Sequence, residues 1–409
     1  MDHDPVPLFA VGIDVGALQC ALAILRPDKS PVAKPSSFPN SAGGFELLER
    51  KLGELKAQPA SIWIGLEATG PYWENLYHHL HKLGYKLLLL NPMQTHEFAA
   101  QRGLRAKTDR IDALSIARLV LSGDARPAYV PEEHIASYRE VVRLMGSLTE
   151  DAARYKMQIR DLLVVLFPEF TQVFKEPSGA TAMGVLKKYP SAAAVAGAGV
   201  ETLAELLAEL TPGRYGRETA EELVRLAKSS VSSGVARAAR ERSLRMLVKQ
   251  LGLLLEHLKE LEKELEQLGK DDPGANSLSS VGEFGPKTVA VLRSELGDVS
   301  RFEHVDQVVA YAGMDPRVRQ SGKWRGKVKL SKRGSGKLRQ LLYMAALRSI
   351  GDKDSEFGRY YRHLVETGVA KKSAIMGVMR KMLMVAYSLL KNGGVYDSSK
   401  VWAGARASS

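Results

Sequence analysis

Buried strands and amphipathic helices alternate along the first 120 residues of the chain. Short apolar runs bounded by turn-forming residues predict strands, and apolar residues that recur every three or four positions predict helices. In chain order, the predicted elements are strands at 8–14 and 18–25, a helix at 43–57, a strand at 60–67, a helix at 71–83 and a strand at 86–91, followed by further helices. This order predicts an α/β sheet with parallel members.

The last helix of this region carries two carboxylates on one face. Residues 104–119 have apolar side chains at helical spacing, and Thr108 or Asp109 can cap the first turn. Asp109 and Asp112 are three residues apart, so on a helix both point the same way. Two like charges on one face are unfavourable unless a cation lies between them, and Mg²⁺ prefers such oxygen ligands. The alternative is a solvated helix face.

Two more carboxylates lie at the ends of predicted strands. Asp14 ends the first strand and Glu67 ends the third. Because sites in open α/β sheets form at the carboxyl ends of strands, all four acids are expected at one edge of the sheet. Four carboxylates would bind two metal ions about 4 Å apart, which clamp the attacking and leaving oxygens of a phosphodiester. Taken singly, Asp14 and Glu67 are better explained as ordinary strand-end residues, and only their combination in this element order favours a site.

The segments around these acids resemble a known protein family. GIDVG around Asp14, GLEATGPYW around Glu67 and KTDRIDALSIARL around Asp109 and Asp112 resemble the DEDD tetrad of RuvC-like nucleases with the ribonuclease-H fold. Together with LNPMQ, they resemble the DEDD transposases of insertion sequences that are mobilised through a bridge RNA. The resemblance covers residues 8–122 and resumes in the C-terminal third. It implies a RuvC-like domain that holds Mg²⁺, or Mn²⁺ in its place, on these four carboxylates.

Two long helical patterns occupy the middle of the chain. Residues 130–170 and 236–269 have apolar residues at helical spacing with charges between them, and they favour an antiparallel coiled-coil arm or an oligomer seam. A helix pair packed within one domain is the open alternative. The residues between them, about 171–235, predict a small helical insertion in which no chemistry is recognisable.

A glycine-containing turn follows a linker at 271–277. Its pattern, VGEFGPKT, looks like a helix-hairpin-helix DNA element. Two glycines would let backbone N–H groups approach a phosphate, and Lys287 adds positive charge. The alternative is an ordinary glycine turn between packed helices.

Residues 317–339 are strongly basic, with ten Lys or Arg in 23 residues and no acid. The charges alternate with Gly, Ser and one Trp, which suits contact with a nucleic-acid backbone better than a helix surface. The predicted nucleic-acid-binding residues are Lys287, Arg317, Arg319, Lys323, Arg325, Lys327, Lys332 and Arg333. A solvated basic face is the usual alternative for such a run.

The same basic stretch resembles the C-terminal domain of the transposase family. AYAGMDP, QSG and LSKRGSGKLR match its pattern, although Met314 and Asp315 depart mildly from the usual apolar pair. In that family the serine of the SG pair is the nucleophile, and it falls here on Ser321. From the residues alone, Ser331 and Ser335 are equal candidates, and a turn or cap role is the alternative for each. A serine hydroxyl needs activation and nearby positive charge to attack a phosphate.

Composition agrees with a nucleic-acid partner. The chain has 409 residues, enough for two or three domains, and a net charge of +12 that favours a polyanion. It has no run of eighteen apolar residues and no signal-peptide pattern, so we expect no membrane partner and a cytoplasmic, nucleoid-associated protein of a bacterium or archaeon. The single cysteine, Cys20, allows no intrachain disulfide and is expected in the core.

The expected fold class is α/β plus α. A ribonuclease-H/RuvC-like metal-binding domain is predicted at 1–128, a long-helix or coiled-coil region at 129–272, a mostly helical C-terminal transposase domain at 273–395 and a flexible tail at 396–409.

The sequence predicts a DNA transposase or recombinase in which Ser321 forms a transient phosphoserine link to DNA, assisted by Mg²⁺. The resemblance implies donor and target DNA, a bridge RNA, and a homodimer or homotetramer in which domains of different protomers complete one site. One alternative is a metal-dependent, structure-specific endonuclease that uses water as its nucleophile. The other is a non-catalytic nucleic-acid-binding protein with relic acids, against which the intact tetrad argues.

Overall fold

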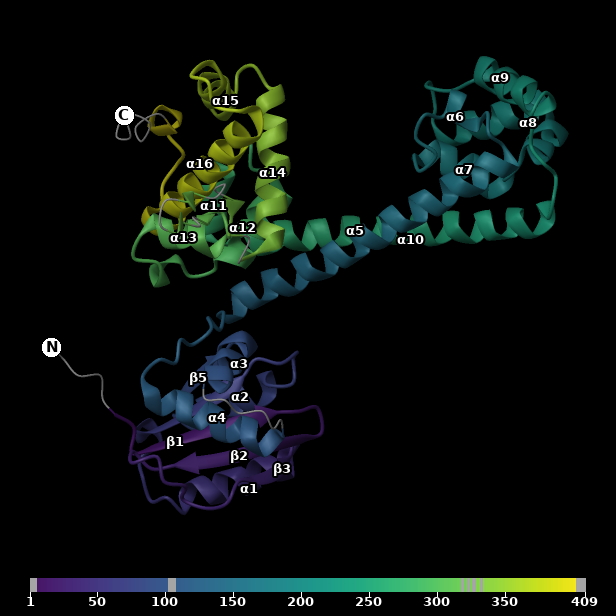
Figure 1. Ribbon diagram of the computed structural model, residues 1–409. Coiled ribbons are helices and arrows are strands. Elements are labelled where there is room, and N and C mark those ends of the chain that lie inside the picture. Colours follow the sequence, from purple (N-terminus) through teal and green to yellow (C-terminus); the bar gives the residue numbers. More distant parts are fainter. Residues whose placement is uncertain are drawn as a thin grey trace. The chain divides into compact units, whose positions relative to one another are not determined.

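The computed structural model describes residues 6–101, 108–317, 320–321, 324–325, 329–331 and 334–401. The chain forms two compact units, Met1–Val130 and Pro131–Ser409 (Figure 1). The first unit contains the α/β sheet and the second is mostly helical, so the expected combination of an α/β part with an α part is confirmed. The finer domain boundaries stay predictions.

Five strands form the sheet of the first unit. They are β1 (Phe9–Val15), β2 (Gln19–Leu25), β3 (Ser36–Pro39), β4 (Ile62–Glu67) and β5 (Lys86–Leu90). Their spatial order is β3-β2-β1-β4-β5; β1, β4 and β5 run parallel, and β2 is antiparallel to both of its neighbours. Four strands lie where the sequence predicts them, and β3 is an additional edge strand. This mixed sheet is compatible with a ribonuclease-H-like DEDD domain.

Helices cover both faces of this sheet because side chains alternate between the faces along each strand. Val11 and Ile13 of β1 pack with α1 and α2, whereas Ala10 packs with α4. The helices of the unit are α1 (Ala42–Gly53), α2 (Glu74–Lys82), α3 (Pro92–Gln101) and α4 (Asp109–Ser122), with a short 3-10 helix, η1 (Pro59–Ser61). The predicted start of α2 at residue 71 is three residues early, because residues 71–73 form a turn.

Two helices of 34 residues, α5 (Glu133–Leu166) and α10 (Arg237–Lys270), lie side by side in the second unit (Figure 1). They are antiparallel, since Tyr138 near the start of α5 shares a buried cluster with Leu265 near the end of α10. The two predicted long helices are therefore confirmed, and they pair within the chain. A coiled coil and an oligomer seam stay predictions. Between them lie α6 (Phe170–Val173), α7 (Ala180–Lys188), α8 (Ala192–Leu210) and α9 (Arg217–Lys228).

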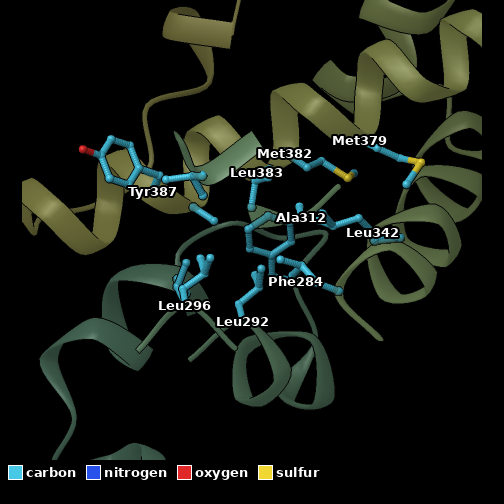
Figure 2. Packing of buried hydrophobic residues seen from close by; sticks show 14 of the residues in the cluster. Phe284, Leu292, Leu296, Ala312, Leu342, Met379, Met382, Leu383 and Tyr387 are labelled. Carbon is cyan, nitrogen blue, oxygen red and sulfur yellow. The ribbon is translucent and has the colours of Figure 1, made fainter. Parts of the chain in front are cut away.

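The C-terminal part of the second unit packs around one apolar core, to which Phe284, Leu342 and Met382 contribute (Figure 2). Met379 and Met382 are buried there. Its elements are α11 (Pro273–Ser279), α12 (Pro286–Leu296), η2 (Val299–Arg301), α13 (Val305–Tyr311), β6 (Pro316–Arg317), β7 (Gln320–Ser321), β8 (Trp324–Arg325), β9 (Lys329–Leu330), α14 (Gly336–Gly351), α15 (Glu356–Glu366), α16 (Lys371–Asn392) and η3 (Ser398–Val401). Among the described helices, α16 alone is long and apolar enough to span a membrane, but it belongs to this core.

A buried ion pair links the start of α11 to α12 and lies beside the start of α5. Arg293 of α12 is 9% exposed, and its Nε donates to Asp272 Oδ2 over 2.6 Å. Asp272 also caps α11, and Arg293 Nη2 lies 3.2 Å from Nε2 of His134 on α5. Burial and the neighbouring Asp272 carboxylate raise the pKa of Tyr138 to about 12. Because a buried charge without its partner is unfavourable, these groups are expected to hold the α5 end in one position.

Candidate functional site

The first two acids of the predicted tetrad end adjacent parallel strands. Ile13 of β1 pairs with Leu66 of β4, so Asp14 and Glu67 follow in register at the same edge. Because side chains alternate along a strand, Asp14 lies on the same face as Ala10, the face that α4 covers. Glu67 lies on that face too, and both side chains are half-buried. The structure therefore places these two carboxylates as the sequence predicts.

Small residues bring α4 close to this edge. A Cβ built on Gly12 of β1 would lie 2.0 Å from the Ala113 carbonyl oxygen and 2.4 Å from the Ala117 nitrogen, so only glycine fits there. Farther back along the strand, Ala10 shares a cluster with Val120. The helix therefore runs antiparallel to β1 and begins at the carboxyl edge of the sheet.

The other two acids lie in the first turn of α4, as predicted. Thr108 caps the helix, and its hydroxyl accepts from Ile111 N at 3.4 Å. Asp109 is exposed, whereas Asp112 is half-buried. The positive end of the helix dipole favours carboxylates at this position. The register of β1 and β4 and the direction of α4 thus bring all four acids to one edge of the sheet.

Two threonine hydroxyls hold the Glu67 carboxylate. Thr69 Oγ1 lies 2.8 Å from Glu67 Oε1, and Thr95 Oγ1 lies 2.6 Å from Glu67 Oε2. Thr95 on α3 is only 7% exposed, and its Oγ1 also lies 3.0 Å from the Pro92 carbonyl oxygen. The sequence analysis missed this residue, although it directly follows the LNPMQ segment. Such an outer contact orients a carboxylate and tunes what it binds.

The thiol of Cys20 is buried close to the same edge. Burial raises its pKa to about 11, and the negative charge of Asp14 adds to the shift against a hydrogen bond from the Gly16 backbone. The expectation that Cys20 belongs to the core is confirmed.

The chemistry of the four acids fits a hard divalent cation, because carboxylate oxygens are the ligands that Mg²⁺ takes. Within the described parts of the chain, however, no three His, Cys, Asp or Glu side chains come together into a group that could hold a metal ion. The edge therefore carries the right kind of donors, but in the described residues they do not converge on one point. The assignment of metal to these acids stays a prediction.

The predicted nucleophile lies on a short β excursion between α13 and α14. The backbone of Ser321 in β7 pairs with Trp324 in β8, and outside this pair β6 lies antiparallel to β9. Arg317 and Arg325 belong to β6 and β8. The other predicted basic residues of this stretch lie outside the described residues: Arg319, Lys323, Lys327, Lys332 and Arg333.

The two competing serines already have local structural roles. Ser335 caps α14, and its Oγ accepts from Leu338 N at 3.1 Å, so the cap interpretation is correct for this residue. Ser331 donates its hydroxyl to the Asp315 carboxylate, and its backbone N–H donates to the Asp315 carbonyl oxygen over 3.0 Å. These bonds close the base of the β excursion.

A glycine and an arginine fix the exit of the excursion. A Cβ on Gly334 would lie 2.2 Å from the Tyr311 carbonyl oxygen, so glycine is required for this close approach to α13. Arg339 Nη1 donates to the carbonyl oxygens of Ala312 and Gly334 over 2.9 and 3.0 Å. The excursion therefore rises from a base that is anchored on both sides.

The glycine turn predicted to bind DNA lies between α11 and α12 and borders a cavity of about 980 Å³. Lys287 is exposed, and the basic side chains of Lys337 and Arg348 line the same cavity. Four acids also line it: Glu150, Glu283, Asp352 and Asp354. Two helices joined by this glycine turn are observed. A role of the turn in DNA binding stays a prediction.

Comparisons with known proteins cover both parts of the chain. Residues 11–168 match the DEDD transposase family of the IS110 type, and residues 275–362 match the family described as Transposase IS116/IS110/IS902. The pilin gene-inverting protein of Moraxella bovis is 22% identical over 88% of this chain and 90% of its own length. An uncharacterized 43.6 kDa protein of insertion element IS110 from Streptomyces coelicolor is 24% identical over 97% of both chains. A transposase of insertion sequence IS1328 from Yersinia enterocolitica is 32% identical over 26% of this chain and 31% of its own.

Proposed function

The chain belongs to the IS110/IS116 family of transposases, and we propose that it joins donor and target DNA through a transient phosphoserine–DNA intermediate that requires Mg²⁺. The observation that carries this proposal is that Asp14 and Glu67 end adjacent parallel strands, and that α4, with two acids in its first turn, begins at the same edge of the sheet. The basic β excursion with Ser321 supplies the second part.

Asp14, Glu67, Asp109 and Asp112 would hold the metal. When bound, Mg²⁺ supplies positive charge to the reacting phosphate and its oxygens. The chain's own contribution is to hold the carboxylates in place, and the hydroxyl of Thr95 does this for Glu67. Mn²⁺ has the same ligand preference and would replace Mg²⁺.

Ser321 would be the nucleophile, as the family resemblance implies, whereas Ser331 and Ser335 have the local hydrogen bonds described above. Its Oγ forms a bond to phosphorus while the bond from phosphorus to one deoxyribose oxygen breaks, and that oxygen takes up the serine proton. In the second step a hydroxyl at another strand end attacks the same phosphorus, and Ser321 regains its proton. The number of phosphodiester bonds is conserved, so strands exchange without an external energy source.

Basic residues would bind the phosphate backbone around this serine. Arg317 of β6 precedes this serine in the chain and Arg325 of β8 follows it. Lys287 lines the cavity at the glycine turn. The net charge of +12 supports a polyanionic partner. A bridge RNA and a homodimer or homotetramer, in which the two parts of different protomers meet, complete the proposal.

Covalent capture tests the proposal. The full-length protein is incubated with Mg²⁺, the RNA of its element and DNA spanning the element ends, then denatured and resolved on a gel. We expect a protein–DNA adduct with wild type, none with Ser321→Ala or Asp14→Asn, and an adduct with Ser335→Asn, which keeps a capping side chain. Loss of the adduct with Ser331→Ala but not with Ser321→Ala would move the nucleophile to Ser331.

A Mg²⁺-dependent, structure-specific endonuclease is the second candidate, because the acids lie in a unit with its own core, and a metal ion held there could activate water without Ser321. It predicts cut DNA without an adduct, unchanged by Ser321→Ala. A non-catalytic binding protein predicts no cutting at all, and Mg²⁺-dependent cutting that Asp109→Asn abolishes would exclude it.

A further inference from the structure

One asparagine ties together the two loops that flank the acidic edge. The backbone N–H of Asn40 donates to the Leu18 carbonyl oxygen over 2.9 Å. Its side-chain Nδ2 donates to the carbonyl oxygens of Gly16 over 3.0 Å and Tyr72 over 3.2 Å. The β1–β2 turn and the loop between β4 and α2 are thereby held to each other.

The loop that carries Tyr72 is further fixed by its own residues. Gly70 has a φ of +57°, a backbone conformation that residues with a side chain rarely adopt. The Tyr72 ring lies 3.5 Å from the position that a Cβ on Gly70 would take. At the start of the loop, Ala68 N donates to the Leu90 carbonyl oxygen, and Thr69 binds the Glu67 carboxylate. The ring is therefore presented by a constrained backbone.

Two apolar side chains extend into solvent from these loops. Leu18 is 82% exposed and Tyr72 is 46% exposed. Leu18 comes four residues after Asp14, and Tyr72 comes five residues after Glu67, so each follows an acid of the edge. Neither side chain carries a charge. They suit a flat apolar group rather than a phosphate.

We propose that Tyr72, together with Leu18, contacts one unstacked nucleobase of the DNA strand whose phosphate lies at the acidic edge. The inference rests on the proposed function and adds a binding contact to it. A tyrosine ring stacks on any base, and stacking tolerates sequence because every base has a π-face. Tyr72 and Leu18 would thus bind the base next to the reacting phosphate and hold the strand in position. Asn40 is a positioning residue that sets the spacing of the two loops.

Fluorescence of a base analogue tests the contact. DNA spanning the element ends carries 2-aminopurine at the positions next to the phosphate that wild type cuts, and Ca²⁺ replaces Mg²⁺ to delay cutting. We expect full-length wild type to quench the fluorescence, Tyr72→Ala to lose the quenching, and Tyr72→Phe to keep it. Leu18→Ser should reduce the quenching partly. Because the Leu18 side chain is 82% exposed, this substitution is not expected to disturb folding. Leu83→Ala, an exposed apolar residue at the other end of α2, is the matched control.

Kinetics give a second measurement. Tyr72→Ala should raise KM for the DNA about 10-fold while the cutting step in saturating DNA changes less. Unchanged quenching and KM in Tyr72→Ala would overturn the inference and leave the proposed function intact. Quenching of 2-aminopurine in the RNA but not in the DNA would overturn the assignment to DNA. Failure of wild type to cut DNA at all would instead contradict the proposed function.

Discussion

The acidic edge and the serine excursion are built in different ways. The edge lies on a five-stranded sheet with helices on both faces, and its position follows from buried contacts such as those of Gly12 with α4. The excursion consists of two-residue strand pairs between α13 and α14, and it depends on a base closed by Asp315 and Ser331. A metal site needs several ligands at fixed spacing, whereas a serine nucleophile is a single hydroxyl with activation and positive charge nearby. The rigid scaffold accordingly carries the acids.

Matched glycine substitutions should separate the two regions most strongly. Gly12→Ala forces a Cβ into the backbone of α4, so we expect unit 1 to lose about 3 kcal/mol of stability. Gly334→Ala forces a Cβ into Tyr311, and we expect adduct formation to fail while the unfolding of unit 1 is unchanged. Calorimetry measures the stability of unit 1 (Met1–Val130), and the adduct assay measures formation of the protein–DNA adduct. Equal loss of unit 1 stability in the two variants would contradict the distinction.

Thr95→Val should weaken the acidic edge without disturbing the serine excursion. Valine keeps the volume but removes the hydroxyl that orients Glu67, so DNA cutting should fall about 10- to 100-fold. The Mg²⁺ concentration for half-maximal cutting should rise, and Thr95→Ser should restore both. A normal Mg²⁺ titration of Thr95→Val would mean that Thr95 does not tune a metal ligand.

Ser331→Ala tests the base of the excursion. The variant loses the hydroxyl that binds the Asp315 carboxylate, a charge-assisted bond, so the adduct should form about 10-fold more slowly. Ser331→Thr should recover most of the rate because it keeps the hydroxyl. The unfolding temperature of unit 1 is the control and should stay constant.

Tyr138→Phe should give the smallest effect, confined to alkaline pH. Folding raises the pKa of Tyr138 to about 12, above the value near 10 of an unfolded tyrosine. The unfolded chain therefore loses this proton first, and the contribution of Tyr138 to stability, complete below pH 10, declines as pH rises to about 12. Urea unfolding of Tyr138→Phe should show a shallower decline over this range. An identical decline would show that Tyr138 does not titrate differently on folding.

Much of the first unit follows from residue patterns. The apolar runs that end in Asp14 and Glu67, and the Thr108 cap before α4, predict where each acid lies along its element. The sequence does not predict β3, because four residues including a proline are too short for a periodic signal. The contact between Thr95 and Glu67 was missed because it spans 28 residues and depends on how α3 packs.

In the second unit, the long helices could be predicted from the sequence and the strands around Ser321 could not. Its two long helices were predictable since helical spacing persists over 34 residues. The strands around Ser321 are two residues long, so no period exists to detect, and the choice of this serine came from a family resemblance. The structure adds partners for Ser331 and Ser335 that no local pattern reveals.

The buried pair of Arg293 and Asp272 fixes one end of the two long helices. The pair lies where α10 leads into α11, and His134 brings the start of α5 to the same point. A helix of 34 residues is about 50 Å long. A tilt of about 5° around this point would therefore displace the far end of the pair, with the bundle of α6–α9, by about 4 Å. A displacement of the bundle would therefore act, over the length of the α5–α10 pair, on the part of the chain that carries Ser321.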